Sequence, residues 1–450
     1  MMRVRLRATL GPRAAGRLRL LPEQGPVAEG VRFWDGVLRI PMGPEPGNRA
    51  EARRRAERAG ALAAAALPEG MPRAVLDARA LAPEEAVAIT AGLALRAPAG
   101  FRLDLWHGDA EALAPLWDAE WSVLQGVMLA RELVAMPGNA LTPKVFAHRL
   151  KRLEAHGVAV QILRRGAMKR AGFGGLLAVG QGSANPPRLV VLRWAGRIPA
   201  APVVFVGKGI TFDSGGVSLK RGAMHEMRED MAGAAACAGA MLALALRDSP
   251  APAAAVLALA ENAIGAAACR PGDVVSTLAG YTVEVVDTDA EGRLALADAL
   301  NYAVRAFRPE VVIDLATLTG AAIAALGHQR AALYGNDPVL AAALCAAGEA
   351  VGERLWPLPV TEADRRALDS DVADLRQCSP ERGQPDGSHA AAFLREFLGG
   401  EPLGWAHLDM AGMVGEAAKG KDAPLSIPGG FGVRLLCTLV GARFEDPHRL

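Results

Sequence analysis

Short apolar runs rich in β-branched residues alternate with Ala- and Leu-rich stretches from about residue 158 onward. Runs of this length and composition are typical of strands, and the longer stretches between several of them are typical of helices. The predicted strands are 158–163, 188–194, 203–206, 253–259, 282–286 and 311–315, and the predicted helices include 230–247 and 291–307. Consecutive strand–helix units predict an α/β fold, with a mixed sheet flanked by helices on both faces.

The first 120 residues predict a second, smaller α/β domain. Strand-like runs at 31–40, 74–76 and 101–105 alternate with helical stretches such as 49–66. At the very start, Arg3, Arg5 and Arg7 alternate with Val4, Leu6 and Ala8. This period of two favours a half-buried strand over the Arg-rich transit peptide that the composition also suggests.

A helix predicted at 117–133 ends at Met136-Pro137-Gly138, a sequence that terminates helices. It is predicted to bridge the two parts of the chain. We therefore expect an N-terminal domain at 1–120, a bridging helix and linker at 121–157, and a catalytic domain at 158–450.

Composition excludes several classes of protein. A net charge of +2 over 450 residues produces no overall electrostatic attraction to nucleic acid or membrane surfaces. The share of apolar residues, 51%, excludes a disordered chain. The five cysteines are scattered, odd in number and form no C-x-x-C, which favours a reducing compartment over a disulfide framework. We find no apolar run of the about 20 residues that would span a bilayer. The expected location is the cytoplasm.

Two predicted strands run into segments that are dense in polar residues. The strand at 203–206 is followed by GKGITFDSGG at 207–216, and the strand at 282–286 by DTDAEGRL at 287–294. In α/β sheets the ligand binds beyond the carboxyl ends of strands. The Gly-Lys-Gly is not a nucleotide phosphate loop, because that motif would need Gly at Pro202 and Ser or Thr at Gly209.

Four carboxylates at these junctions suggest a metal site: Asp213, Asp230, Asp289 and Glu291. Their combined charge of about −4 suits two divalent cations, without which the cluster would be strongly self-repelling. The eight histidines are dispersed. Oxygen-rich ligation therefore favours Zn, Mn or Mg. The alternative is that Asp287 or Asp289 caps the next helix and Glu291 favours its dipole, while Lys208 is a surface lysine.

These residues carry a resemblance to a known family. The segments VGKGITFDSGG (206–216), DTDAEGRLALADAL (287–300) and DLATLTGA (314–321) resemble the signature stretches of the leucyl aminopeptidase family, the cytosolic dinuclear-metal exopeptidases. Flanking matches such as ARELVAMPGNALTP (130–143), ENAIG (261–265) and WAHLDMAG (405–412) extend the resemblance over about 126–440. The first 120 residues match weakly and are short for the family.

The resemblance implies a role for each site residue. Asp213 and Glu291 would bridge two metals, Asp289 would serve the first, and Lys208 and Asp230 the second. Lys208 would bind as a neutral amine, which Arg cannot do, and only 7 lysines stand beside 43 arginines in this chain.

Two further residues would act on the substrate. Lys220, protonated, would stabilise the developing gem-diolate. Arg293 would anchor a bicarbonate ion that acts as the general base, with backbone contacts from 316–320. A pocket for the first side chain would be lined by Met227, Thr317, Gly320 and Ala411, although these four also suit an ordinary core.

The implied function is hydrolysis of an apolar N-terminal residue, such as Leu or Met, from peptides through a bridging hydroxide on two metals. A homohexamer is implied as well. The alternatives are a narrower dipeptidase or cysteinylglycinase on the same site, a non-catalytic assembly scaffold, and a DNA-binding regulator. Residues 1–120 carry 17 Arg against 15 acidic residues, which is no basic patch, so the sequence does not favour nucleic acid.

The chain departs from the family pattern in four places. Asp287 replaces the usual Asn, the interval from Lys220 to Asp230 is one residue shorter than expected, and 426–430 replaces a Gly-rich loop. The N-terminal domain is also short. None of these changes removes an expected ligand or catalytic residue.

Overall fold

The computed structural model describes residues 2–9, 18–24, 30–381, 383–400, 402–415 and 430–446, so most of the atypical 426–430 loop lies outside the described residues. The chain divides into two compact units. The first comprises residues 1–124 with 349–352, and the second comprises 125–348 with 353–450. Helix α3 (Ala110–Ala135) runs through the boundary between them. It begins earlier than predicted, with Pro115 inside it.

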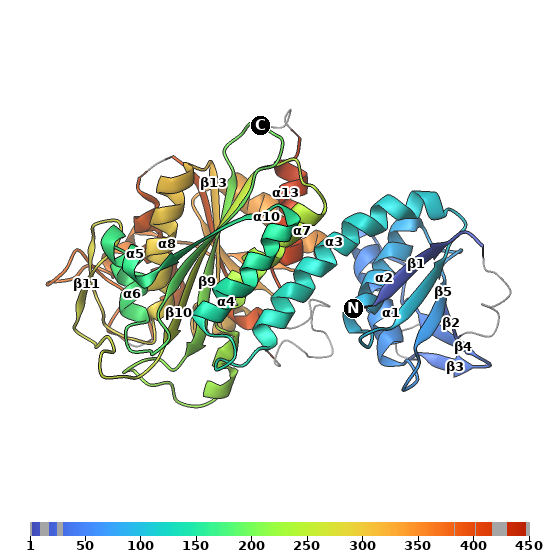
Figure 1. The fold of residues 1–450 in the computed structure, drawn as a ribbon, viewed down its shortest axis with the longest axis horizontal. Helices are drawn as coiled ribbons and strands as arrows, with labels where there is room; N and C mark the ends of the chain where they lie inside the picture. Colours follow the sequence, from blue (N-terminus) through green and yellow to red (C-terminus); the bar gives the residue numbers. More distant parts are fainter. Residues whose placement is uncertain are drawn as a thin grey trace. The chain divides into compact units, whose positions relative to one another are not determined.

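The first unit is a sheet with strand order β1-β6-β5-β2-β4-β3, accompanied by two helices (Figure 1). Its elements are β1 (Arg3–Arg7), β2 (Leu18–Glu23), β3 (Arg32–Trp34), β4 (Val37–Pro41), α1 (Arg49–Ala65), β5 (Arg73–Asp77), α2 (Pro83–Arg96) and β6 (Arg102–Trp106). The strand predicted at the Arg-rich start is confirmed, because β1 pairs in parallel with β6.

The run at 31–40, predicted as one strand, is a hairpin. Asp35 and Gly36 separate β3 from β4 and have φ angles of 47° and 71°. The type I′ turn that joins many two-residue hairpins requires positive φ at both central residues, which Asp-Gly adopts readily. The Asp-Gly pair was the signal for this turn.

The second unit is built on a sheet with strand order β15-β14-β17-β13-β9-β10-β8-β7. The strands are β7 (Ala159–Arg164), β8 (Arg188–Trp194), β9 (Val203–Asp213), β10 (Ala253–Asn262), β13 (Val311–Ala316), β14 (Ala331–Gly335), β15 (Leu355–Pro357) and β17 (Gly404–Asp409). The sheet is mixed, since β8 runs antiparallel to β10 and β14 antiparallel to β17, while β9 has parallel neighbours. The predicted α/β fold class is confirmed.

The strand predicted at 282–286 does not join this sheet. It forms β12 (Thr282–Glu284) in a small sheet with β11 (Val274–Ser276) and β16 (Leu375–Arg376). Of the three residues of β12 only Val283 is buried, whereas β9 and β10 are almost continuously buried. A strand with polar residues on alternate positions suits a half-exposed sheet and not the centre of an α/β sheet.

Helices cover the central sheet on both faces. The helices of this unit include α4 (Pro143–Leu150), α5 (Arg165–Ala171), α6 (Gly174–Val179), α7 (Ala232–Leu246), α8 (Glu291–Phe307), α9 (Gly320–Leu326), α10 (Pro338–Val351), α11 (Glu362–Arg366), α12 (Asp386–Arg395) and α13 (Val433–Arg443). Even-numbered β9 residues such as Val204 and Val206 join the core under α8. Odd-numbered Gly207 and Gly209 face α7, where an added Cβ would lie within 3.2 Å of Ala234 atoms. The two glycines thus allow α7 to pack closely.

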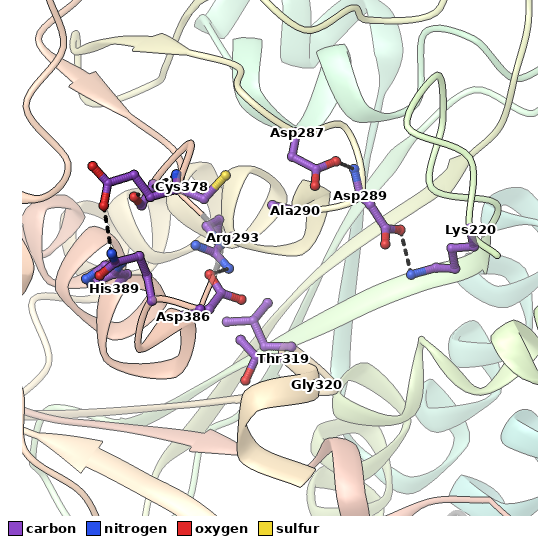
Figure 2. A pocket seen from close by; sticks show the side chains of 15 residues that line it. Lys220, Asp287, Asp289, Ala290, Arg293, Thr319, Gly320, Cys378, Asp386 and His389 are labelled. Atoms are coloured by element: carbon purple, nitrogen blue, oxygen red, sulfur yellow. Dashed lines mark hydrogen bonds and ion pairs between the residues drawn. The ribbon is translucent and has the colours of Figure 1, made fainter. Parts of the chain in front are cut away.

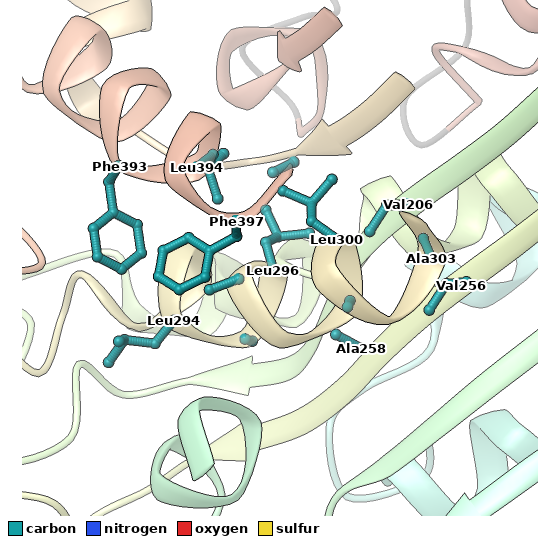
Figure 3. Packing of buried hydrophobic residues seen from close by; sticks show 14 of the residues in the cluster. Val206, Val256, Ala258, Leu294, Leu296, Leu300, Ala303, Phe393, Leu394 and Phe397 are labelled. Carbon is teal, nitrogen blue, oxygen red and sulfur yellow. The ribbon is translucent and has the colours of Figure 1, made fainter. Parts of the chain in front are cut away.

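Figure 3 shows the core between α8, α12 and the sheet. The labelled side chains from the sheet are Val206, Val256 and Ala258, and those from the helical layer include Leu294, Leu296, Leu300, Phe393 and Phe397. Each is at most 2% exposed. Burial of a Leu or Phe side chain is worth about 1.5–3 kcal/mol, so this layer fixes the start of α8 firmly against the sheet.

One helical segment, Met224–Leu246, is long and apolar enough to cross a membrane by length and composition, although its first residues include Glu226, Arg228 and Asp230 and it is no uninterrupted apolar run. It contains α7, and 78% of its most apolar window is buried inside the protein. Such burial is typical of the core helix of a globular protein.

Candidate metal centre

Strand β9 brings Lys208 and Asp213 to the same place, although they are five residues apart. An odd spacing normally puts two side chains on opposite faces of a strand. The pairing with β10 shifts here: Ala260 pairs with Ile210 and Asn262 pairs with Asp213, so β9 contains one extra residue. This bulge returns Asp213 to the face of Lys208.

The turn before α8 supplies the next two carboxylates, Asp289 and Glu291. The N-cap position of α8 is Ala290, which makes no side-chain hydrogen bond. Asp287 Oδ1 accepts a hydrogen bond from the Asp289 backbone N–H at 2.9 Å, as the oxygen of an Asn side chain would. The alternative in which these acids cap the helix is therefore not observed, and the Asn-to-Asp departure preserves the turn.

Residues distant in sequence hold this turn in place. The Asn262 amide donates to Asp213 Oδ1 at 2.8 Å and to the Thr288 carbonyl at 3.0 Å. The Gln377 side chain accepts from the Val286 N–H at 2.8 Å and donates to the Ala290 carbonyl at 3.0 Å. Neither residue was singled out from the sequence. Only ENAIG at 261–265, a flanking match to the family, pointed near Asn262.

The four predicted carboxylates and two lysines form one cluster. Oxygen atoms of Asp213, Asp289 and Glu291 all lie within 4.8 Å of one another. Lys208 Nζ lies 2.8 Å from Asp230 Oδ1 and 2.9 Å from Glu291 Oε1. Lys220 Nζ lies 2.8 Å from Asp213 Oδ2 and 2.5 Å from Asp289 Oδ1. All of the predicted metal-binding side chains are therefore brought together.

Burial and mutual repulsion oppose the charged forms of these acids. Burial, with the charge of Asp213 added to it, raises the pKa of Glu291 to about 8 despite the attraction of Lys208. Burial likewise raises the pKa of Asp230 to about 6. The two lysines therefore do not neutralise the cluster completely.

For the two lysines the surroundings favour the charged form. Burial disfavours the charged form of Lys208, but the carboxylates of Asp230 and Glu291 outweigh it, so the pKa of Lys208 is raised. The pKa of Lys220 is raised in the same way by Asp213 and Asp289. Among the chain's own groups Lys208 is thus a cation. The neutral amine predicted for it requires another cation beside the carboxylates.

The chemistry of the donor set fits divalent cations. Buried oxygens of Asp230 (Oδ2) and Glu291 (Oε2) have no hydrogen-bond donor within the described part of the chain. A buried carboxylate oxygen without a donor is costly, and a cation would satisfy it. Carboxylate oxygens with one amine nitrogen form a set that suits Zn, Mn or Mg.

A pocket of about 310 Å³ opens beside the cluster, lined by Lys220, Asp289, Arg293 and Gly320 among others (Figure 2). Arg293 is 1% exposed. Its Nη1 donates to the Gln377 carbonyl at 3.0 Å, and its Nη2 to Asp386 Oδ1 at 2.8 Å. Asp386 was not singled out from the sequence, because nothing local connects it to Arg293.

Of the four predicted substrate-pocket residues, one is among the described residues that line this pocket. Gly320 is part of its lining, and Thr317 hydrogen-bonds to Asp230 Oδ1 at 2.7 Å through its hydroxyl. Met227 lies in the 3₁₀ turn Met224–Glu229 before Asp230, and Ala411 begins another at Ala411–Met413. Their role in substrate binding stays a prediction.

Gly292 provides a test of how tightly Lys208 is packed. A Cβ at this position would lie 2.6 Å from Lys208 Cε and 2.8 Å from its Nζ. Gly292→Ala is therefore expected to displace the amine and weaken divalent-metal binding by about 10–100-fold, the range found when a metal ligand loses its support. Isothermal titration with Mn²⁺ measures this. Gly166→Ala, whose Cβ would meet nothing closer than 3.7 Å, is the control and should bind as the wild type does; equal binding by both variants would contradict the expectation.

Comparison with known proteins agrees with the site. Residues 128–437 match the model of the cytosol aminopeptidase family, catalytic domain. A probable cytosol aminopeptidase of Gluconobacter oxydans is 46% identical over 336 residues, which cover 74% of this chain and 67% of that protein. One of Chelativorans sp. is 47% identical over 331 residues, covering 73% and 66%. The matched stretch thus spans about two thirds of these relatives.

A solved structure is similar over nearly the whole chain. The bottromycin maturation enzyme BotP in complex with Mn has a TM-score of 0.83 and 34% identity, covering 95% of this chain and 99% of that one. The family model alone matches more than half of the chain. The chain therefore belongs to the cytosol aminopeptidase family and is a metal-dependent, leucyl aminopeptidase-type hydrolase.

Proposed function

We propose that this enzyme removes apolar N-terminal residues such as Leu and Met from peptides, with the clustered acids as its metal ligands. The observation that carries the proposal is the convergence of Asp213, Asp289 and Glu291 on one point beside a pocket of about 310 Å³. Such a pocket is at the lower end of the range for small-ligand sites, which suits the end of a peptide.

Asp213 and Glu291 would bridge two divalent ions, Asp289 would complete the first, and Lys208 and Asp230 the second. When bound, the ions would activate a water and polarise the scissile carbonyl. The Mn in the solved relative supports Mn here, with Zn and Mg as further candidates.

Lys220 and Arg293 would supply the fixed positive charges of the site. Lys220 lines the pocket and its raised pKa keeps it protonated, so it can stabilise an oxygen that becomes negative. Arg293 would hold an anion in the same pocket. Bicarbonate is the predicted anion, and it would have to share Arg293 with Asp386.

Peptide hydrolysis after metal removal tests this function. Dialysis against a chelator should abolish release of Leu from Leu-Gly-Gly, and Mn²⁺ or Zn²⁺ should restore it. N-acetyl-Leu-Gly-Gly, which lacks the free amine, should not be cleaved. Full activity with only trace metal would refute the proposal. A panel of dipeptides and longer peptides separates a general aminopeptidase from the dipeptidase or cysteinylglycinase.

Assembly as a homohexamer and a cytoplasmic location are further parts of the proposal that come from the family. Light scattering of the purified protein measures the first. A fully active monomer would exclude the hexamer without affecting the assignment of the metal ligands. Salt-dependent retention on DNA would be the sign of the regulator alternative.

A further inference from the structure

The buried Arg293 already holds a carboxylate from its own chain. Its guanidinium donates to Asp386 Oδ1 at 2.8 Å, and the Arg293 side chain is only 2% exposed whereas that of Asp386 is 44% exposed. Asp386 is the first residue of α12 and lines the pocket. Figure 2 shows it extending from α12 toward Arg293, beside Thr319 and Gly320. One carboxylate oxygen is thus fixed while the group as a whole stays accessible from the pocket.

The other acids of this pocket are less suited to exchange protons with a substrate. Asp289 is paired with Lys220 and is an expected metal ligand. Asp287 accepts the Asp289 N–H, which holds the turn. Glu381 is bonded to the Gln384 side chain and touches no cation among the described residues. In contrast, Asp386 Oδ2 has no hydrogen-bond donor within the described part of the chain.

We propose that Asp386 is the proton-transfer group of the hydrolysis, held on Arg293 in the place where an external bicarbonate is otherwise expected. The proposal rests on the aminopeptidase function proposed above. A pocket of about 310 Å³ has room for on the order of ten waters, so a proton can reach Asp386 directly or through one water.

The proton balance of the step is complete. As the water oxygen forms its bond to the scissile carbonyl carbon, one water proton moves to Asp386. As the C–N bond breaks, this proton moves to the leaving nitrogen and Asp386 is a carboxylate again. The second water proton stays on the new carboxyl group, which ionises in solvent. No external base is consumed.

The first experiment compares the Mn²⁺-loaded wild type in buffer freed of carbon dioxide with the same enzyme in bicarbonate. Because Asp386 already occupies Arg293, kcat for Leu-Gly-Gly should be the same in both buffers. A tenfold loss without bicarbonate, recovered on adding it back, would overturn the proposal.

Two variants then separate the occupation of Arg293 from the proton transfer. Asp386→Ala should keep its Mn content and lose about 10²–10⁴-fold in kcat with little change in KM, the range for general acid–base groups. Bicarbonate or formate should partly rescue it, because Arg293 is then free. Asp386→Asn should lose as much in kcat and should not be rescued by either anion, since its amide oxygen still occupies Arg293. Asp371→Asn, the same exchange at an exposed position outside the pocket, is the control and should keep the wild-type kcat.

A binding measurement keeps the test independent of turnover. Line broadening of ¹³C-bicarbonate should appear with Asp386→Ala and be absent with the wild type. Broadening by the wild type, or wild-type kcat in Asp386→Ala, would overturn the role of Asp386. If the Mn²⁺-loaded wild type cleaves no peptide, the proposed function fails. Line broadening then still decides whether Asp386 excludes bicarbonate from Arg293.

Discussion

Lys208→Arg is expected to abolish binding of the second metal and to lower kcat/KM by at least about 10³-fold, because the variant loses a metal on which catalysis depends. An arginine keeps its proton and offers no lone pair to a metal. It is also too large for the site. Lys208 is 3% exposed, and an added Cβ on Gly292 would already lie 2.6 Å from its Cε.

Metal analysis after gel filtration measures this effect directly. Lys169→Arg, an exchange of the same type at an exposed position, is the control and should retain the full metal content. In the wild type, metal binding should also release a proton, since the carboxylates of Asp230 and Glu291 keep Lys208 protonated until a metal replaces that proton. Metal affinity should therefore rise with pH. Two metals per chain in Lys208→Arg would show that Lys208 is not a ligand.

The site was predictable where its residues are close in sequence. The segments 206–216 and 287–300 contain Lys208, Asp213, Asp289 and Glu291, and helix α8 has the bounds predicted for it. The strand predicted at 203–206 is longer, however, since β9 continues to Asp213 and Lys208 lies within it. The glycines around Lys208 were correctly separated from a phosphate loop. Glycine is needed at 207 and 209 because α7 packs closely against β9, and the local sequence does not specify that contact.

The positioning of the site was not predictable from the sequence alone. The bulge in β9 depends on its register with β10, and without it Asp213 would face away from Lys208. Gln377 and Asp386 reach the site from 84 and 93 residues beyond Arg293. Local patterns of hydrophobicity and turn residues contain no information about such pairs. The polar alternation at 282–284 did contain a signal, that of a half-exposed strand, which was overlooked when this run was predicted as a strand of the main sheet.

Lys220→Met is expected to separate catalysis from metal binding. Lys220 Nζ lies within 2.8 Å of both Asp213 and Asp289, so its ammonium competes with a metal for these two carboxylates. Removal of that charge should leave metal affinity unchanged or higher. Catalysis should change in the opposite direction, because loss of one charge that stabilises a developing oxyanion costs about 10²–10³-fold in kcat, or about 3–4 kcal/mol.

The companion variant Lys220→Arg keeps the charge but places it differently. Its kcat should also fall while its metal content holds, and KM should change little in either variant, since the contact strengthens only in the transition state. Steady-state kinetics with saturating Mn²⁺, combined with metal titration, measures both quantities. Loss of metal in Lys220→Met would instead make Lys220 part of the support of the ligands. Wild-type kcat in both variants would show that Lys220 has no part in catalysis. The positive charge that stabilises the oxyanion would then have to come from Arg293, which is already paired with Asp386.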